Sequence, residues 1–121
     1  MKQVLVVDDS AVIRKVARRI LEGLQFSTGE AADGRAALAA CEQGMPDVIL
    51  LDWNMPVMDG LEFLGELRKM PGGLAPKVIF CTTENEVGHI ARAMHAGADE
   101  YIMKPFDQHI VRSKFEEIGL V

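Results

Sequence analysis

The amino-acid sequence predicts an α/β protein built on a doubly wound, five-stranded parallel sheet with helices on both faces. Short apolar runs rich in β-branched residues alternate with segments of helical periodicity, which is typical of strands joined by crossover helices. The run at 48–51 is apolar at every position, which indicates a strand buried on both faces, as in parallel sheets. Right-handed crossovers then put helices on both faces, while the pattern alone leaves the strand order open.

Each predicted strand is a short run that ends at a polar or turn-forming residue. The run within 26–31 is the weakest because it contains Gly29, and we therefore place it at an edge of the sheet. The other runs are dominated by large aliphatic and aromatic side chains, which favour strands. In chain order the predicted strands cover residues 3–7, 26–31, 48–52, 77–82 and 100–103.

Each predicted helix has a recognisable beginning or end. Ser10 and Asp33 are candidate N-caps for the first two helices, and Asp107 is a candidate for the last. Asp59 with Glu62 three residues later resembles a capping box for the third helix. The expected stop signals are Gly44 with Pro46, residues 71–73, and Gly97, which would end a fourth helix over residues 85–96.

Apolar residues spaced three and four apart predict which side of each helix faces the sheet. The inward residues are expected to be Val12, Ile13, Val16, Ala17, Ile20, Leu21 and Leu24 in the first helix, Ala36, Ala37, Leu38, Ala40 and Cys41 in the second, Leu61, Phe63, Leu64 and Leu67 in the third, and Ile110, Val111, Phe115 and Ile118 in the last.

Composition limits the class of protein. A chain of 121 residues that is 49% hydrophobic fits one domain with a packed core. The net charge of −5 and the lack of a basic block argue against nucleic-acid binding. Cys41 and Cys81 are expected to be buried, reduced thiols rather than zinc ligands or a disulfide. The four-residue apolar run at the N-terminus is too short for a signal peptide or a membrane span, so we expect a cytosolic protein without membrane contact.

Five polar residues follow the apolar runs and are predicted to form one site. They are Asp8, Asp9, Asp52, Thr82 and Lys104. The carboxyl ends of parallel strands meet along one edge of a sheet, where ligands bind, so these side chains are expected to converge. A carboxylate cluster facing a lysine suits a divalent metal ion together with a phosphoryl group.

This set, followed by Pro105 and arranged in this order on this pattern, resembles the receiver domain of bacterial response regulators. The similarity covers essentially the whole chain and is greatest to the single-domain members that act in chemotaxis. It implies a flavodoxin-like (βα)5 fold with strand order 2-1-3-4-5. It also implies a single receiver domain over residues 1–121 without an output domain.

The resemblance assigns chemistry to most of these residues. Asp52 would be the phosphoacceptor, since a carboxylate can act as a nucleophile and hold an acyl phosphate. Asp8, Asp9, Asp52 and the backbone carbonyl of Asn54 would hold Mg²⁺. Lys104 would contact the phosphoryl oxygens as a point charge, and its peptide bond to the following proline is expected to be cis.

The resemblance also predicts how the site would signal. Thr82 would bond to the phosphoryl group, and Tyr101 would follow it inward as the second part of a switch. Asn54, Thr83 and Glu84 would tune the rate at which the acyl phosphate hydrolyses. The switching surface would consist of residues 85–96, the strand at 100–103 and the last helix.

The expected function is a stand-alone response regulator of a two-component system, not an enzyme apart from slow self-dephosphorylation. Its partners would be a histidine kinase or phosphotransfer protein and a target protein, and the chain is expected to be a monomer, with a phosphorylation-dependent dimer as the alternative.

A phosphorelay intermediate and a receiver excised from a larger regulator are alternative functions. A metal-dependent phosphohydrolase is less favoured because Asn54, not an aspartate, stands two residues after Asp52. A flavin carrier is less favoured because Asp8 and Asp9 would repel the FMN phosphate.

The remaining aromatic and imidazole residues are expected to play other parts. His89, His95 and His109 do not form a ligand set, and solvated surface positions are expected for all three. Trp53 follows the acceptor and is expected to report optically on events beside it.

Overall fold

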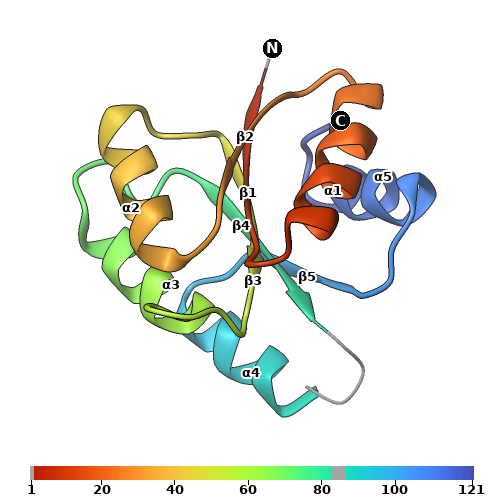
Figure 1. Cartoon of the computed structure of the whole chain (residues 1–121). Coiled ribbons are helices and arrows are strands. Elements are labelled where there is room, and N and C mark those ends of the chain that lie inside the picture. The colour runs from red at the N-terminus through yellow and green to blue at the C-terminus, as the bar shows by residue number, and fades with distance from the viewer. Residues whose placement is uncertain (1, 83–86) are drawn as a thin grey trace.

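The computed structural model describes residues 2–82 and 87–121. Within these ranges five strands alternate with five helices, and all strands are parallel in one sheet of order β2-β1-β3-β4-β5 (Figure 1). The strands are β1 (Gln3–Val7), β2 (Ser27–Ala31), β3 (Val48–Asp52), β4 (Lys77–Thr82) and β5 (Glu100–Met103). The helices are α1 (Ala11–Gly23), α2 (Gly34–Gln43), α3 (Gly60–Lys69), α4 (Val87–Ala96) and α5 (Gln108–Glu117). The predicted fold class and strand order are confirmed, and the weak second strand lies at an edge.

The predicted N-caps are present where the structure describes them. The side chains of Ser10, Asp33, Asp59 and Asp107 accept hydrogen bonds from the backbone N–H three residues later, at 3.3, 2.8, 2.8 and 2.9 Å. The reciprocal capping box of α3 is complete. The predicted start of the fourth helix at Asn85 lies outside the described residues. Short-range capping chemistry therefore sets several helix boundaries that the sequence predicted.

The helices cover both faces of the sheet and divide the core into two apolar clusters. Figure 1 shows α1 and α5 on one face and α2, α3 and α4 on the other. On the first face Leu21 and Phe115 are fully buried, and Phe115 packs edge-on against Phe26 with ring centroids 5.2 Å apart. On the second face Phe63 and Leu64 of α3 are fully buried. The central strands lie between these clusters, as their uninterrupted apolar sequence predicted.

Four residues expected to face inward are exposed instead, and one of them is Ala36 of α2. Val12 is 70% exposed, Val16 46% and Ile110 37%. With roughly 100° of rotation per residue, Val16 and Val12 point roughly 100° and 140° away from buried Ala17, beyond the line along which a helix touches a sheet. The apolar stripe of α1 is therefore wider than the face that the sheet can cover.

The expectation that both cysteines are buried thiols is confirmed. Cys41 and Cys81 are free and buried. Burial raises the pKa of the Cys41 thiol to about 11 and that of Cys81 to about 12, so both stay protonated at neutral pH. Among the helices that the structure describes, none has the length and apolarity needed to cross a bilayer.

Candidate functional site

The strand order brings together residues that lie far apart in the chain. β1 is paired with β3, β3 with β4, and β4 with β5, so four neighbouring strands end along one edge. Asp8 directly follows β1, Asp52 and Thr82 end β3 and β4, and Lys104 directly follows β5. The chain reverses its winding direction between β1 and β3, which is where open α/β sheets form crevices at their carboxyl ends.

Lys104, after β5, contacts the aspartates at the ends of β1 and β3. Its Nζ lies 3.1 Å from Oδ2 of Asp8 and 2.9 Å from Oδ1 of Asp52. The side chains of the two aspartates are only 5% and 12% exposed, and that of Lys104 is 20% exposed. Charged groups this close and this shielded from solvent interact strongly. The three residues predicted to converge therefore form one ion-paired group.

A third carboxylate completes an acidic cluster. Asp8, Asp9 and Asp52 each place an oxygen atom within 4.8 Å of the other two. Three carboxylates against the one ammonium of Lys104 leave two surplus negative charges. Oxygen ligands with a surplus of this size fit a divalent cation such as Mg²⁺, and Asp9 is exposed, so the cluster is open to solvent. The residues present therefore fit the predicted metal.

The main chain around Asp8 is held from several directions. Its N–H donates to the carbonyl of Ala31 on β2 at 3.1 Å, and its Oδ1 accepts from the N–H of Ser10 at 2.9 Å. Its own carbonyl accepts from Nη1 of Arg14 at 2.6 Å. The sequence analysis missed Arg14, because its contacts depend on how α1 packs beside β2. Asp8 is thus fixed by β2 and α1 as well as by Lys104.

Burial controls the protonation of the pair at the centre. It raises the pKa of Asp52, and the hydrogen bond from Lys104 only partly offsets this, while the charges of Asp8 and Asp9 raise it further. Burial also works against charged Lys104, but the hydrogen bonds to Asp52 and Asp8 outweigh it, so the pKa of Lys104 is raised. The ion pair alone would lower the pKa of Asp52. The opposite shift arises because burial outweighs the contribution of Lys104, and a bound cation would act against it.

The predicted switch residues lie on β4 and β5. Thr82 is buried, and its carbonyl accepts a hydrogen bond from the backbone N–H of Lys104 at 2.6 Å. Tyr101 is half-buried, opposite Phe80 in the sheet register, and Nζ of Lys114 lies 4.8 Å from the centroid of its ring. The structure therefore connects Thr82 directly with Lys104, while Tyr101 lies further back on β5.

The other predicted site residues occupy different surroundings. Asn54 is exposed in the loop after β3, and its role as a backbone ligand stays a prediction. The Lys104–Pro105 peptide bond, expected to be cis, is cis. Thr83 and Glu84 lie outside the described residues, so their expected influence on dephosphorylation stays a prediction.

An aromatic pair beside Asp52 corrects one expectation. Trp53 is 6% exposed, and its backbone N–H donates to Oδ1 of Asp52 at 2.9 Å. His89 of α4 stacks on the Trp53 ring with centroids 4.2 Å apart and planes 11° from parallel. The solvated position expected for His89 is therefore wrong, because a flat imidazole can pack against indole, whereas His95 and His109 are exposed as expected.

Comparisons with known proteins agree with this geometry. The response regulator receiver domain family matches residues 4–116. The chemotaxis protein CheY of Pseudomonas aeruginosa is 34% identical over 117 residues, 96% of this chain and 94% of that protein. The CheY of Halobacterium salinarum is 35% identical over 117 residues, 97% and 96% of the two chains. The solved structure of the chemotaxis response regulator CheY4 of Vibrio cholerae superposes with a TM-score of 0.91 at 33% identity, over 98% of each chain.

Proposed function

Because the chain belongs to the response regulator receiver domain family, we propose that it is a phosphoryl-controlled signalling switch whose acceptor is Asp52. Members of this family are signalling proteins in two-component systems, and the chain is similar to single-domain members named for chemotaxis. The observation that carries the proposal is the acidic cluster of Asp8, Asp9 and Asp52 with Lys104 bonded across it. Structural ion pairs do not need three carboxylates for one lysine.

The chemistry follows from the residues of the cluster. An oxygen of Asp52 attacks the phosphorus of a phosphohistidine donor, and the new O–P bond forms as the P–N bond breaks. The electron pair of the P–N bond goes to the donor imidazole, which leaves as a neutral ring because its other nitrogen carries a proton from solvent. Asp8, Asp9 and Asp52, with the carbonyl of Asn54, would hold Mg²⁺, which would neutralise charge on the phosphoryl oxygens. Lys104 supplies a positive charge from the opposite side. The protein's contribution is positioning and charge balance, which is what phosphoryl transfer needs most.

The signal is the change in charge at Asp52. A phosphoryl group there replaces the carboxylate as the partner of Lys104 and adds negative charge. The backbone N–H of Lys104 is bonded to the carbonyl of Thr82, so a shift of either residue moves the ends of β4 and β5 together. The switch then acts through Thr82 and Tyr101 on the surface of α4, β5 and α5, where a target protein binds.

The proposal extends to partners and location. A histidine kinase or phosphotransfer protein supplies the phosphoryl group, and the protein acts as a monomeric, stand-alone regulator in the cytoplasm. These statements rest on the family and its single-domain members.

The test is incubation with acetyl phosphate and Mg²⁺, followed by intact mass measurement. The wild type should gain one phosphoryl group, and Asp52→Asn should gain none. Asp47→Asn is the matched control, because Asp47 precedes the same strand at its opposite end and should leave the gain intact. Phosphorylation of Asp52→Asn to the wild-type extent would place the acceptor elsewhere. Turnover of a phosphomonoester by the wild type would favour the phosphohydrolase.

A further inference from the structure

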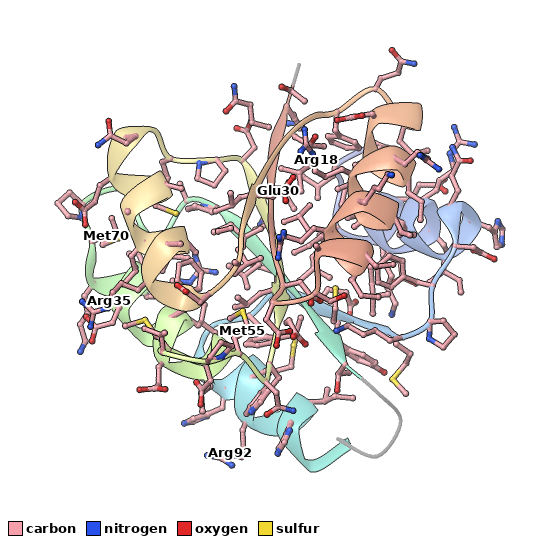
Figure 2. The ribbon with its side chains drawn as sticks, in the orientation of Figure 1. Arg18, Glu30, Arg35, Met55, Met70 and Arg92 are labelled. Carbon is pink, nitrogen blue, oxygen red and sulfur yellow. The ribbon has the colours of Figure 1, made fainter. Side chains whose placement is uncertain are left out.

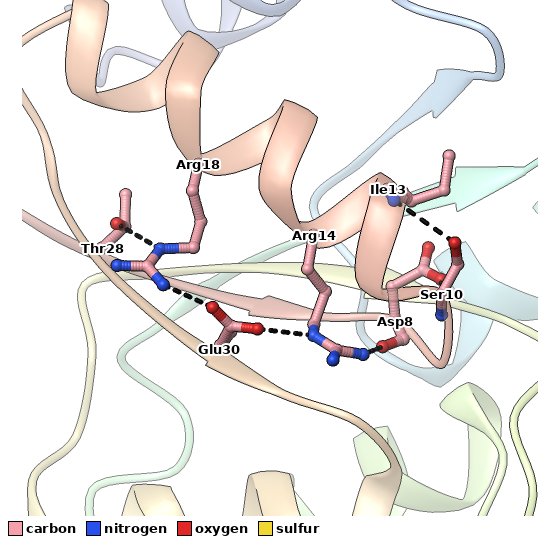
Figure 3. Close-up of polar contacts among 7 residues, drawn as sticks. All are labelled: Asp8, Ser10, Ile13, Arg14, Arg18, Thr28 and Glu30. Atoms are coloured by element: carbon pink, nitrogen blue, oxygen red, sulfur yellow. Dashed lines mark hydrogen bonds and ion pairs between the residues drawn. The ribbon is translucent and has the colours of Figure 1, made fainter.

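Arg14 links the acidic cluster to the edge strand. Its guanidinium donates through Nη1 to the carbonyl of Asp8 at 2.6 Å and through Nε to Oε1 of Glu30 at 2.7 Å (Figure 3). The side chain is only 15% exposed. A planar guanidinium that donates to two partners at once is held in one orientation, unlike a solvated surface arginine.

The carbonyl of Asp8 belongs to the peptide bond that joins Asp8 to Asp9. A peptide unit is planar, so the position of that oxygen also fixes the plane in which the nitrogen and Cα of Asp9 lie. Asp8 has further restraints through Ser10 and Lys104, whereas Asp9 is exposed. The direction of the Asp9 carboxylate therefore depends on the orientation of this peptide unit.

Glu30 of β2 is itself held by a second arginine. Arg18 pairs with Oε2 of Glu30, and its Nε donates to Oγ1 of Thr28 at 3.0 Å. Figure 2 shows Arg18 and Glu30 side by side between α1 and β2. Arg18 and Arg14 thus share the same glutamate, but within this network the contact with Asp8 is made by Arg14. The weak edge strand, which supplies no side chain to the acidic cluster, still supports it through Glu30.

We propose that Arg14 is a positioning residue of the metal site, which aims the Asp9 carboxylate by clamping the Asp8–Asp9 peptide while Glu30 holds the guanidinium in place. This inference rests on the proposed function, since it concerns Mg²⁺ binding by the same carboxylates. Groups that orient metal ligands typically contribute tenfold or more to metal affinity.

The experiment measures Mg²⁺ affinity of the full chain by calorimetry and by the fluorescence of Trp53, the single tryptophan. Arg14→Ala should bind Mg²⁺ about tenfold more weakly than the wild type. Removing a positive charge beside a cation site would by itself strengthen binding, so a weaker affinity has the opposite sign to the electrostatic effect. Arg14→Lys keeps the charge but loses the two-pronged geometry, and it should also weaken binding.

Arg18→Ala is the matched control, because it removes an arginine from the same glutamate without touching Asp8. Its Mg²⁺ affinity should stay within about twofold of the wild type, as for other partly exposed ion pairs. Glu30→Gln should weaken binding less than Arg14→Lys. Urea unfolding of each variant shows that it is folded, and Arg14→Lys with Glu30→Gln carry the test if Arg14→Ala does not fold.

The outcomes separate this inference from the proposed function. A wild type that binds Mg²⁺ and a folded Arg14→Ala or Arg14→Lys with unchanged affinity would overturn the positioning role alone. Equal losses in Arg14→Ala and Arg18→Ala would also overturn it, because they would indicate general packing of α1 on β2. A wild type without Mg²⁺ binding by either method would overturn the metal site itself.

Discussion

The two ends of the sheet differ in how well their charged groups are paired with protein atoms. At the amino end, Arg68 donates to the carbonyls of Gly73, Pro76 and Gly97 at 2.9, 2.9 and 2.7 Å, and it pairs with Asp99 at 3.3 Å. The same oxygen of Asp99 also accepts from the backbone N–H of Val78 at 2.8 Å. At the carboxyl end, three carboxylates face one lysine.

The difference separates charged groups that stabilise the fold, at the amino end, from charged groups that suit a bound ligand, at the carboxyl end. Arg68 is satisfied by protein atoms, and it ties the loop before β4 to the turn before β5. The carboxyl end keeps two surplus negative charges, which destabilise the protein alone and favour a bound cation. A charge imbalance of this kind costs stability and is typical of binding sites rather than of structural ones. The following experiments test whether the two ends behave as differently as their contacts indicate.

The largest effect is expected at the amino end. Arg68→Ala should lower the free energy of unfolding by about 3 kcal/mol, because it leaves the carbonyls of buried Gly73 and Pro76 without their charged donor and removes one ion pair of Asp99. Urea denaturation measures this change. Lys69→Ala is the matched control on the same helix, since Lys69 is 77% exposed, and it should change stability by at most about 0.5 kcal/mol. Equal effects of the two substitutions would show that the Arg68 contacts are not structural.

The next effect concerns cation binding at the carboxyl end. Mg²⁺ at ten times its dissociation constant should raise the free energy of unfolding by about 1.4 kcal/mol, because it binds only the folded cluster. Asp9→Asn should reduce this increment at the same Mg²⁺ concentration. Arg68→Ala should keep it in full, since the two ends of the sheet are independent. Loss of the increment in Arg68→Ala would mean that the ends are coupled.

A smaller effect is expected in the loop after β3. Val57 has φ of +71°, a left-handed conformation that is unfavourable for a β-branched residue, and its side chain is 72% exposed. Val57→Asn should therefore stabilise the protein by about 1 kcal/mol. Leu74→Asn is the control for loss of an exposed apolar side chain, since Leu74 is 79% exposed, and it should stay within about 0.5 kcal/mol of the wild type. A destabilised Val57→Asn would show that the loop favours valine for another reason.

The parts of the molecule that the sequence predicted are those determined locally or by the sheet. Caps such as Asp59 act over three residues, and a parallel sheet necessarily brings Asp8, Asp52 and Lys104 to one edge. Contacts between elements were not predictable in the same way. Arg14 has the pattern of a solvated helix residue until the register of β2 places Glu30 beside it.

The position of His89 shows the same limit. Its stacking on Trp53 depends on how α4 lies against β3, which no short-range signal in the sequence specifies. The inward position expected for Val12 was wrong for a related reason. An apolar stripe along a helix does not determine how much of the helix surface the sheet will cover. Long-range packing, rather than residue type, separates the confirmed expectations from the wrong ones.

The smallest effect concerns Glu30, whose charge lies near the carboxyl end of the sheet but is paired with two arginines. Hydrogen bonds from Arg14 and then Arg18 lower the pKa of Glu30 below its ordinary value of 4.5. A lowered pKa in the folded state means that Glu30 stabilises the fold above pH 4.5 and that this contribution is lost as the pH falls through the folded value. The wild type should exceed Glu30→Gln in unfolding free energy by less than about 1 kcal/mol at neutral pH, because the Glu30 side chain is 37% exposed and screened by solvent. Urea unfolding of both proteins from about pH 7 to about pH 3 should show this difference disappearing in acid. A difference that persists at the acid end would mean that the ionic contacts of Glu30 contribute nothing and that its packing alone supports Arg14.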